Sequence, residues 1–181
     1  MAPNRLIATS TGGSPWCVPE VLQLFKQFTE GKTVVVGRKT YEIRNKAIKG
    51  CDNVVLTRDP SWWADDVTVI NKPEQLAGVI DLHKDIYIIG GREIYTEFLP
   101  NIEELYTFTI YQPVKEEPYG IYFPEFIDKF DHYLSVKKYD EFEYGVWYKE
   151  EGFKSFVPTF SPRVRDRGYK EPLPELVIND K

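Results

Sequence analysis

Three short groups of residues have the composition of a phosphate-binding site. Gly37-Arg38-Lys39-Thr40 combines a glycine, which lets a ligand approach the backbone closely, with two cations and a hydroxyl group. Thr57-Arg58 adds a further hydroxyl and cation, and Gly90-Gly91 adds two adjacent glycines. Each group alone is weak evidence, because exposed cations and glycine turns are common. Together they suit a ligand that carries several phosphates.

Each group directly follows a short apolar run that is typical of a buried strand. The runs are residues 33–36, 53–56 and 86–89, and we expect the third to be buried on both faces. After the third run and its two glycines, apolar residues recur at helical spacing up to Pro100. In an open α/β sheet, ligands bind at the C-terminal ends of the strands. The three groups are therefore expected to meet at one edge of a sheet.

The rest of the chain continues this alternation and then changes to strands alone. We expect further strands at 5–9, 67–70, 105–110, 133–136 and 143–148, and helices at 18–31 and 72–82. The pattern predicts an α/β fold: a central, mainly parallel twisted sheet with an antiparallel C-terminal edge and flanking helices.

Composition excludes several classes of function. The chain has 181 residues and a net charge of -5, which indicates one domain and disfavours a nucleic-acid partner. Cys17 and Cys51 form no disulfide framework and, with two histidines in the chain, offer no metal site. This cysteine usage suits the reducing cytoplasm. No apolar run approaches the roughly 20 residues that a membrane span needs, so no membrane association is expected.

The end of the chain has a different composition from the rest. We place a globular domain at residues 1–151 and a Pro-rich tail at 152–181, which contains four prolines and a cluster of cations without clear periodicity. The tail is either solvated or an arm that packs on another subunit and makes the protein a homo-oligomer.

The stretch from Asp85 to Pro100, with Pro15-Trp16, Gly37-Arg38-Lys39-Thr40 and Phe123-Pro124, closely resembles dihydrofolate reductases, and the resemblance extends over residues 5–151. It implies the dihydrofolate-reductase-like fold, NADPH as cofactor and hydride transfer to C6 of dihydrofolate, which yields tetrahydrofolate. By motif match, the cofactor positions are Thr9, Gly37, Arg38, Lys39, Thr40, Thr57, Arg58, Ile89, Gly90, Gly91, Arg92 and Tyr95. The substrate positions are Ile7, Trp16, Val21, Phe25, Ile48, Cys51 and Phe108.

The substrate half departs from the family at the acid that assists protonation of N5. The resemblance places that acid at Val21, which cannot hydrogen-bond a pterin. Glu20 is adjacent and is the candidate catalytic acid, although one residue is about 100° around a helix. The threonine that partners the acid in the family is replaced by Phe108, between Thr107 and Thr109. Val21 and Phe108 fit each other, because an unpaired buried acid or hydroxyl is costly.

Two further departures concern the ends of the substrate. The arginine that binds the glutamate tail of folate in the family is expected just after Gly50, where this chain has Cys51, and a neutral thiol cannot form that ion pair. The loop at residues 10–14 is also much shorter than the lid that normally closes over the nicotinamide.

Three hypotheses follow for the function. The first is an NADPH-dependent reductase of 7,8-dihydrofolate. The second keeps the cofactor but replaces the substrate with another pterin or a pyrimidine-like heterocycle that lacks a glutamate tail. The third is a non-catalytic structural or binding protein whose contact arm is the tail at 152–181.

Overall fold

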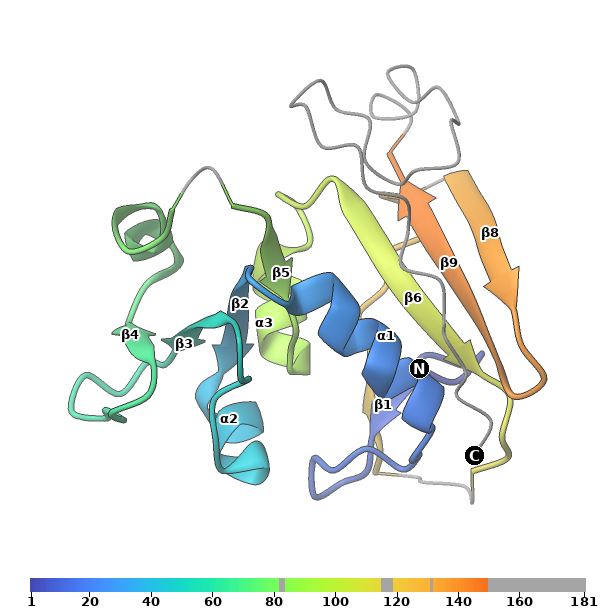
Figure 1. Cartoon of the computed structure of the whole chain (residues 1–181), viewed down its shortest axis with the longest axis horizontal. Coiled ribbons are helices and arrows are strands. Elements are labelled where there is room, and N and C mark those ends of the chain that lie inside the picture. Colours follow the sequence, from blue (N-terminus) through green and yellow to red (C-terminus); the bar gives the residue numbers. More distant parts are fainter. Residues whose placement is uncertain (82–83, 115–118, 131, 150–181) are drawn as a thin grey trace.

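Strands and helices alternate in the first part of the chain, and strands follow alone (Figure 1). The computed structural model describes residues 1–81, 84–114, 119–130 and 132–149. In chain order the elements are β1 (Leu6–Ala8), α1 (Pro19–Thr29), β2 (Thr33–Gly37), α2 (Arg38–Arg44), β3 (Asp52–Leu56), β4 (Thr68–Ile70), the 3₁₀-helix η1 (Pro73–Gly78), β5 (Ile86–Ile88), α3 (Arg92–Phe98), β6 (Glu104–Ile110), β7 (Ile121–Tyr122), β8 (His132–Lys138) and β9 (Phe142–Tyr148). None of the helices in these ranges is long and apolar enough to cross a membrane.

The first half of the chain builds a parallel sheet with the strand order β4-β3-β2-β5. Its central strand is β2, where Val34 and Val35 are fully buried. The register aligns the strand ends that carry the phosphate-binding groups. Gly37 lies opposite Leu56 of β3, and Val35 lies opposite Ile88 of β5. The residues that follow these strands therefore emerge at the same edge of the sheet, as the sequence predicts.

The second half forms antiparallel pairs, in which β9 lies between β6 and β8 and, separately, β1 pairs with β7. In Figure 1, α1 crosses in front of the space between the parallel strands and β6. Helix α1 buries Leu24 and Phe28 in one cluster with Phe142 and Tyr144 of β9. The helix begins where the sequence predicts, with Val18 as N-cap and a proline at its first position.

The predicted fold class is confirmed, with four local corrections. The helix expected at 72–82 is wrong: a short 3₁₀-helix ends at Gly78, a poor helix former that is followed by β-branched residues. Burial of β5 on both faces is also wrong, because Ile86 is 38% exposed at the edge of the parallel sheet. The apolar pattern of the helix at 18–31 also predicts that Leu22 faces the core, but this side chain is 61% exposed. Strand β7 was not expected. The predicted tail at 152–181 lies outside the described residues.

Gly145 on β9 offers a test of how the antiparallel sheet is packed. The ring of Tyr133 lies across this glycine, packs on Trp147 with centroids 4.5 Å apart and donates a hydrogen bond to Glu143 Oε1 (2.7 Å). A Cβ atom at position 145 would overlap that ring. We expect Gly145→Ala to lower the free energy of unfolding by about 1–3 kcal/mol, measured by urea denaturation.

The matched control is Gly78→Ala. A Cβ atom there would meet nothing within 4 Å, so the change in unfolding free energy should stay within about 0.5 kcal/mol. Equal losses in the two variants would show that the Tyr133 contact is not the cause.

Candidate functional site

The carboxyl ends of β2 and β5 touch each other through backbone that carries no side chains. The N–H of Gly37 donates a hydrogen bond to the carbonyl of Gly90 (2.7 Å). A Cβ atom at Gly37 would lie 2.8 Å from Ile94 Cγ1, and one at Gly91 would lie 3.0 Å from Thr40 Oγ1. Gly90 has φ +105 and is joined to Gly91 by a cis peptide bond. We call these three residues the glycine cradle (Gly37, Gly90 and Gly91): side chains of neighbouring residues pack directly against their backbone, and only glycine leaves them that space.

The residues on either side of the glycine pair hold the cradle in place. Ile89 donates its N–H to the carbonyl of Val35 (2.9 Å), which extends the pairing of β5 with β2. The ring of Tyr95 lies 2.9 Å from the position of a Cβ atom on Gly90, and it packs on Phe123 with centroids 4.7 Å apart. Burial raises the pKa of Tyr95 to about 12, so its phenol is neutral. Tyr95 therefore acts as a support beneath Gly90.

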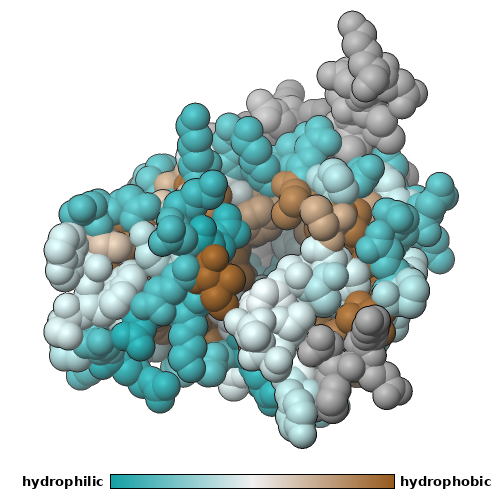
Figure 2. Space-filling view, turned by 90° about the horizontal axis from the view of Figure 1, so that it is seen from below, coloured by the Kyte–Doolittle hydropathy of each residue, from teal (hydrophilic) through white to brown (hydrophobic). Residues whose placement is uncertain are grey.

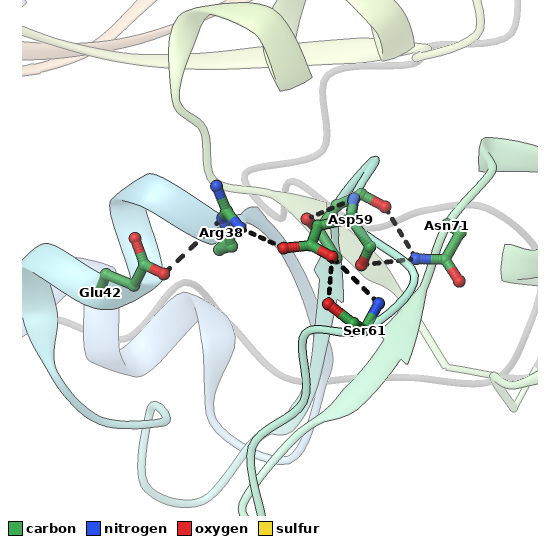
Figure 3. A network of polar contacts seen from close by, with 6 residues as sticks. Arg38, Glu42, Asp59, Ser61 and Asn71 are labelled. Atoms are coloured by element: carbon green, nitrogen blue, oxygen red, sulfur yellow. Dashed lines mark hydrogen bonds and ion pairs between the residues drawn. The ribbon is translucent and has the colours of Figure 1, made fainter.

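Arg38, at the start of α2, is held by two carboxylates (Figure 3). Its NH1 lies 2.9 Å from Asp59 Oδ2, and its Nε lies 3.7 Å from Glu42 Oε1. Ser61 donates to Asp59 Oδ1 from its backbone N (3.0 Å) and from Oγ (2.7 Å). These bonds, with a smaller contribution from Arg38, hold the pKa of Asp59 below its usual range. Asp59 is consequently an ionised and fixed partner of Arg38.

The turn that carries Asp59 is itself held by two side chains. Asn71 donates from Nδ2 to the carbonyls of Thr57 (2.9 Å) and Asp59 (3.3 Å). Thr57 is buried, and its Oγ1 accepts the N–H of Asp59 at 3.2 Å. Thr57, assigned to the cofactor by motif match, thus shapes the turn. Its neighbour Arg58 is exposed.

The remaining cations assigned to the cofactor are open to solvent. Lys39, Arg58 and Arg92 are exposed, and none of them forms an ion pair with another residue in the described ranges. Thr9 lies in the tight turn after β1, where its N–H donates to the carbonyl of Gly13 (2.8 Å). Free guanidinium and ammonium groups are what an incoming phosphate requires.

The apolar half of the site gathers around α1 and β6. Trp16, Val21 and Phe108 all pack against the buried cluster that joins α1 to β9. The indole Nε1 of Trp16 is buried and has no hydrogen-bond partner among the described residues. A buried donor without a partner is costly.

The residues near Val21 do not supply the acid that the sequence resemblance places at this position. Side chains of β6 alternate between its faces, and Phe108 faces α1 with its ring 6.3 Å from that of Phe28. Thr107 points the other way and accepts the Nε1–H of Trp147 (3.3 Å), so it cannot take over the role of the missing threonine. Glu20 lies in the first turn of α1 and makes no hydrogen bond or ion pair with the described part of the chain.

The other substrate positions are spread more widely. Ile7 packs with Tyr95 and Phe123 in a separate cluster, and Phe25 is half-buried on α1. Ile48 and Cys51 lie before or at the N-terminal end of β3, where Cys51 Sγ donates to the carbonyl of Thr29 at 3.1 Å. The structure therefore brings Trp16, Val21 and Phe108 together but places Ile48 and Cys51 at the end of β3 that is opposite Arg58.

A cavity of about 500 Å³ lies at the N-terminal ends of β2, β3 and β4. Its lining includes Cys51 and the carboxylates of Asp52, Asp65, Asp66 and Asp81. These charges repel phosphates, so the glycine cradle at the opposite edge is the better cofactor site. Figure 2 shows the face on which α2 and the turn after β1 lie, and this face is hollowed near its centre with hydrophobic surface beside the hollow.

Two residues of the site were missed from the sequence. Asp59-Pro60-Ser61 has the composition of an Asx turn, which is a signal that would have found Asp59. Asn71 lies 12 residues away from Asp59 and carries no local signal, because its role depends on the pairing of β4 with β3.

Comparison with known proteins gives a consistent result. Residues 1–145 match the sequence profile of a family described as "Dihydrofolate reductase". Dihydrofolate reductase type 3 of Salmonella typhimurium is 38% identical over 92 residues, which are 51% of this chain and 57% of that protein. Dihydrofolate reductase of Bacillus subtilis is 29% identical over 126 residues, which are 70% of this chain and 73% of that protein. The chain thus spans between about half and three quarters of the length of these curated relatives.

The fold has a match among solved structures. Dihydrofolate reductase from Enterococcus faecalis, complexed with NADP(H) and RAB-propyl, superposes with a TM-score of 0.70 and 23% sequence identity. The match covers 83% of this chain and 92% of that chain. At this identity the comparison establishes the common fold.

Gly90 and Gly31 provide a matched pair for testing the cradle. Both have a positive φ, +105 and +72, and a Cβ atom at Gly31 would meet nothing within 4 Å. Alanine at Gly31 has a backbone cost of about 1–2 kcal/mol, and at Gly90, whose φ lies outside the left-handed helical region, the cost is at least as large. Gly90→Ala should lose a further 1–3 kcal/mol or so of unfolding free energy, because its methyl group would collide with Tyr95. Urea unfolding measures the loss of unfolding free energy in both alanine variants. Equal losses would mean that the Tyr95 ring moves aside at no cost.

Proposed function

The chain belongs to the dihydrofolate reductase family, and from this premise we propose that it is an NADPH-dependent reductase of 7,8-dihydrofolate. The observation that carries the proposal is the meeting of the strand ends: Gly37 N–H donates to the Gly90 carbonyl at 2.7 Å, and the exposed Lys39 and Arg58 follow β2 and β3 at the same edge of the sheet. NADPH, when bound, supplies the hydride that reduces C6 of the dihydropterin. The chain itself binds, orients and shields the two reactants.

The cofactor half of the site fits a dinucleotide diphosphate. The cradle offers backbone at close range, and the exposed Arg58 and Lys39 offer charge that is not engaged elsewhere in the described ranges. Arg38 is bonded to Asp59, the residue that directly follows Arg58 in the turn after β3. The two arginines are the proposed partners of the 2′-phosphate that distinguishes NADPH from NADH.

The substrate half supports a flat, partly polar heterocycle. Trp16 offers a partly buried indole, and Val21 and Phe108 offer apolar surface in the same cluster. Position 21 is a valine, so it cannot supply the proton that N5 requires. Glu20 is the adjacent carboxyl group on α1 and the proposed source, either directly or through solvent.

A second candidate function keeps the cofactor and changes the substrate. Cys51, at the position where the family binds the glutamate tail, lines the cavity that also contains four aspartates. Their negative charge opposes the carboxylates of a glutamate tail. This observation favours a pterin or pyrimidine-like heterocycle that has no such tail.

A non-catalytic role remains the third candidate, and it depends on the tail at 152–181, which lies outside the described residues. A homo-oligomer formed through that tail and a cytoplasmic location are likewise proposals. The cysteine usage supports the cytoplasm.

The test of the proposed function is oxidation of NADPH by the purified protein, followed at fixed cofactor concentration with two substrates. One is 7,8-dihydrofolate, and the other is a 7,8-dihydropterin that lacks the aminobenzoylglutamate tail. Turnover that depends on dihydrofolate is the expected result. Turnover of the tail-less compound alone would favour the second candidate. If NADPH does not bind, as measured by quenching of tryptophan fluorescence, both reductase proposals are wrong.

The 2′-phosphate assignment is tested by replacing both Arg38 and Arg58 with alanine. Loss of two charge-assisted contacts should weaken NADPH binding about 10-fold or more and NADH binding about 2-fold or less. Arg44→Ala, at an exposed position in the last turn of the same helix α2, is the control and should change neither affinity. Equal losses for the two cofactors would contradict the assignment.

A further inference from the structure

The positive charge of Arg38 is opposed by two carboxylates that contact it. Arg38 NH1 is 2.9 Å from Asp59 Oδ2, and Arg38 Nε is 3.7 Å from Glu42 Oε1. The guanidinium and its two carboxylates carry a combined charge of one negative unit. Figure 3 shows the two carboxylates on either side of the arginine. A phosphate that approaches Arg38 therefore meets an arginine whose charge is already opposed.

The position of this group in the sheet determines which part of a dinucleotide it meets. The glycine cradle joins β2 to β5, whereas Arg38, Asp59 and Arg58 lie where β2 meets β3, on the other side of β2. If the diphosphate lies over the cradle, the adenosine ribose lies toward β3, beside Arg38 and Asp59. A carboxylate at the end of a strand is also a good acceptor for the hydroxyl groups of a ribose.

We propose that Asp59 limits the preference of this site for NADPH over NADH, because it competes with the 2′-phosphate for Arg38 and offers an acceptor to an unphosphorylated ribose. The inference rests on the proposed function, since it concerns the same cofactor site. It implies that the affinities for NADPH and NADH differ less than they would without the Asp59 carboxylate.

Asp59 is better suited to this role than Glu42. Its carboxylate has the shorter contact with Arg38, and two hydrogen bonds from Ser61 fix its orientation. Asn71 ties the carbonyls of Thr57 and Asp59, so the turn cannot easily carry the carboxylate away when a phosphate arrives. Glu42 is exposed on α2 and has the longer contact, so it can swing into solvent.

The experiment is Asp59→Asn, with dissociation constants for NADPH and NADH measured by fluorescence quenching at low salt. Asparagine keeps the size of the side chain and an oxygen that accepts from Ser61, but it removes the charge. We expect NADPH to bind about 3- to 5-fold more tightly, as for removal of one competing surface ion pair. NADH should bind equally or more weakly, so the ratio of the two constants rises. Added salt should reduce the difference in NADPH affinity between Asp59→Asn and the unchanged protein.

Two further variants separate this effect from a general change in charge. Asp52→Asn removes a carboxylate from the opposite end of β3, where Asp52 pairs with Lys84 at 2.7 Å, and it should leave the ratio unchanged. Glu42→Gln should raise the ratio less than Asp59→Asn, and it tests the same competition if Asp59→Asn does not fold.

Either of two results overturns the inference. An unchanged ratio in Asp59→Asn would show that the carboxylate does not compete, and weaker NADPH binding would show that Asp59 holds Arg38 ready for the phosphate. If the unchanged protein binds neither nucleotide, the proposed function itself fails. If it binds both but Asp59→Asn has no effect, only this inference fails.

Discussion

The hydrogen bond from Gly37 N–H to the Gly90 carbonyl, 2.7 Å long, is the contact on which the site depends. It joins the ends of β2 and β5 at the edge of the parallel sheet, and it is possible because neither glycine has a Cβ atom. At Gly37 that atom would lie 2.8 Å from Ile94, and at Gly90 it would lie 2.9 Å from Tyr95. Both side chains belong to α3, so glycine at these two positions lets α3 pack directly against the ends of β2 and β5.

The two halves of the site differ in polarity. On the cofactor side, polar groups are engaged with one another: Ser61, Asn71 and Asp59 form a fixed turn, and Asp59 binds Arg38. On the substrate side, Val21 and Phe108 are apolar where the family has an acid and its partner. An acid buried in that cluster without a partner would destabilise the fold. The absence of polar side chains at both positions 21 and 108 is therefore physically consistent. The proposed sources of the proton are then Glu20 and solvent.

The acidic cavity at the other end of the sheet bears on the substrate as well. Its lining includes four aspartates and Cys51, whose thiol donates to the carbonyl of Thr29. One of the four, Asp52, is paired with Lys84 at 2.7 Å. The neutral thiol and the acidic lining are both consistent with the second candidate, a substrate without a glutamate tail.

Local signals in the sequence determined the elements and the glycine cradle. Short apolar runs gave β2, β3 and β5, Pro19 marked the start of α1, and the parallel register brought Gly37 and Gly90 to one edge. Local signals failed where the outcome depends on distant partners. The helix expected at 72–82 became a short 3₁₀-helix, and β7 formed because β1 was available to pair with it.

The charge state of Arg38 is likewise a property of the tertiary structure. Arg38 and Asp59 are 21 residues apart, and they meet only because β2 and β3 lie side by side in register. The sequence by itself determined that cations follow these strands. Whether those cations are free or already paired was decided by tertiary packing, since Coulomb interactions depend on distance in space and not on separation along the chain.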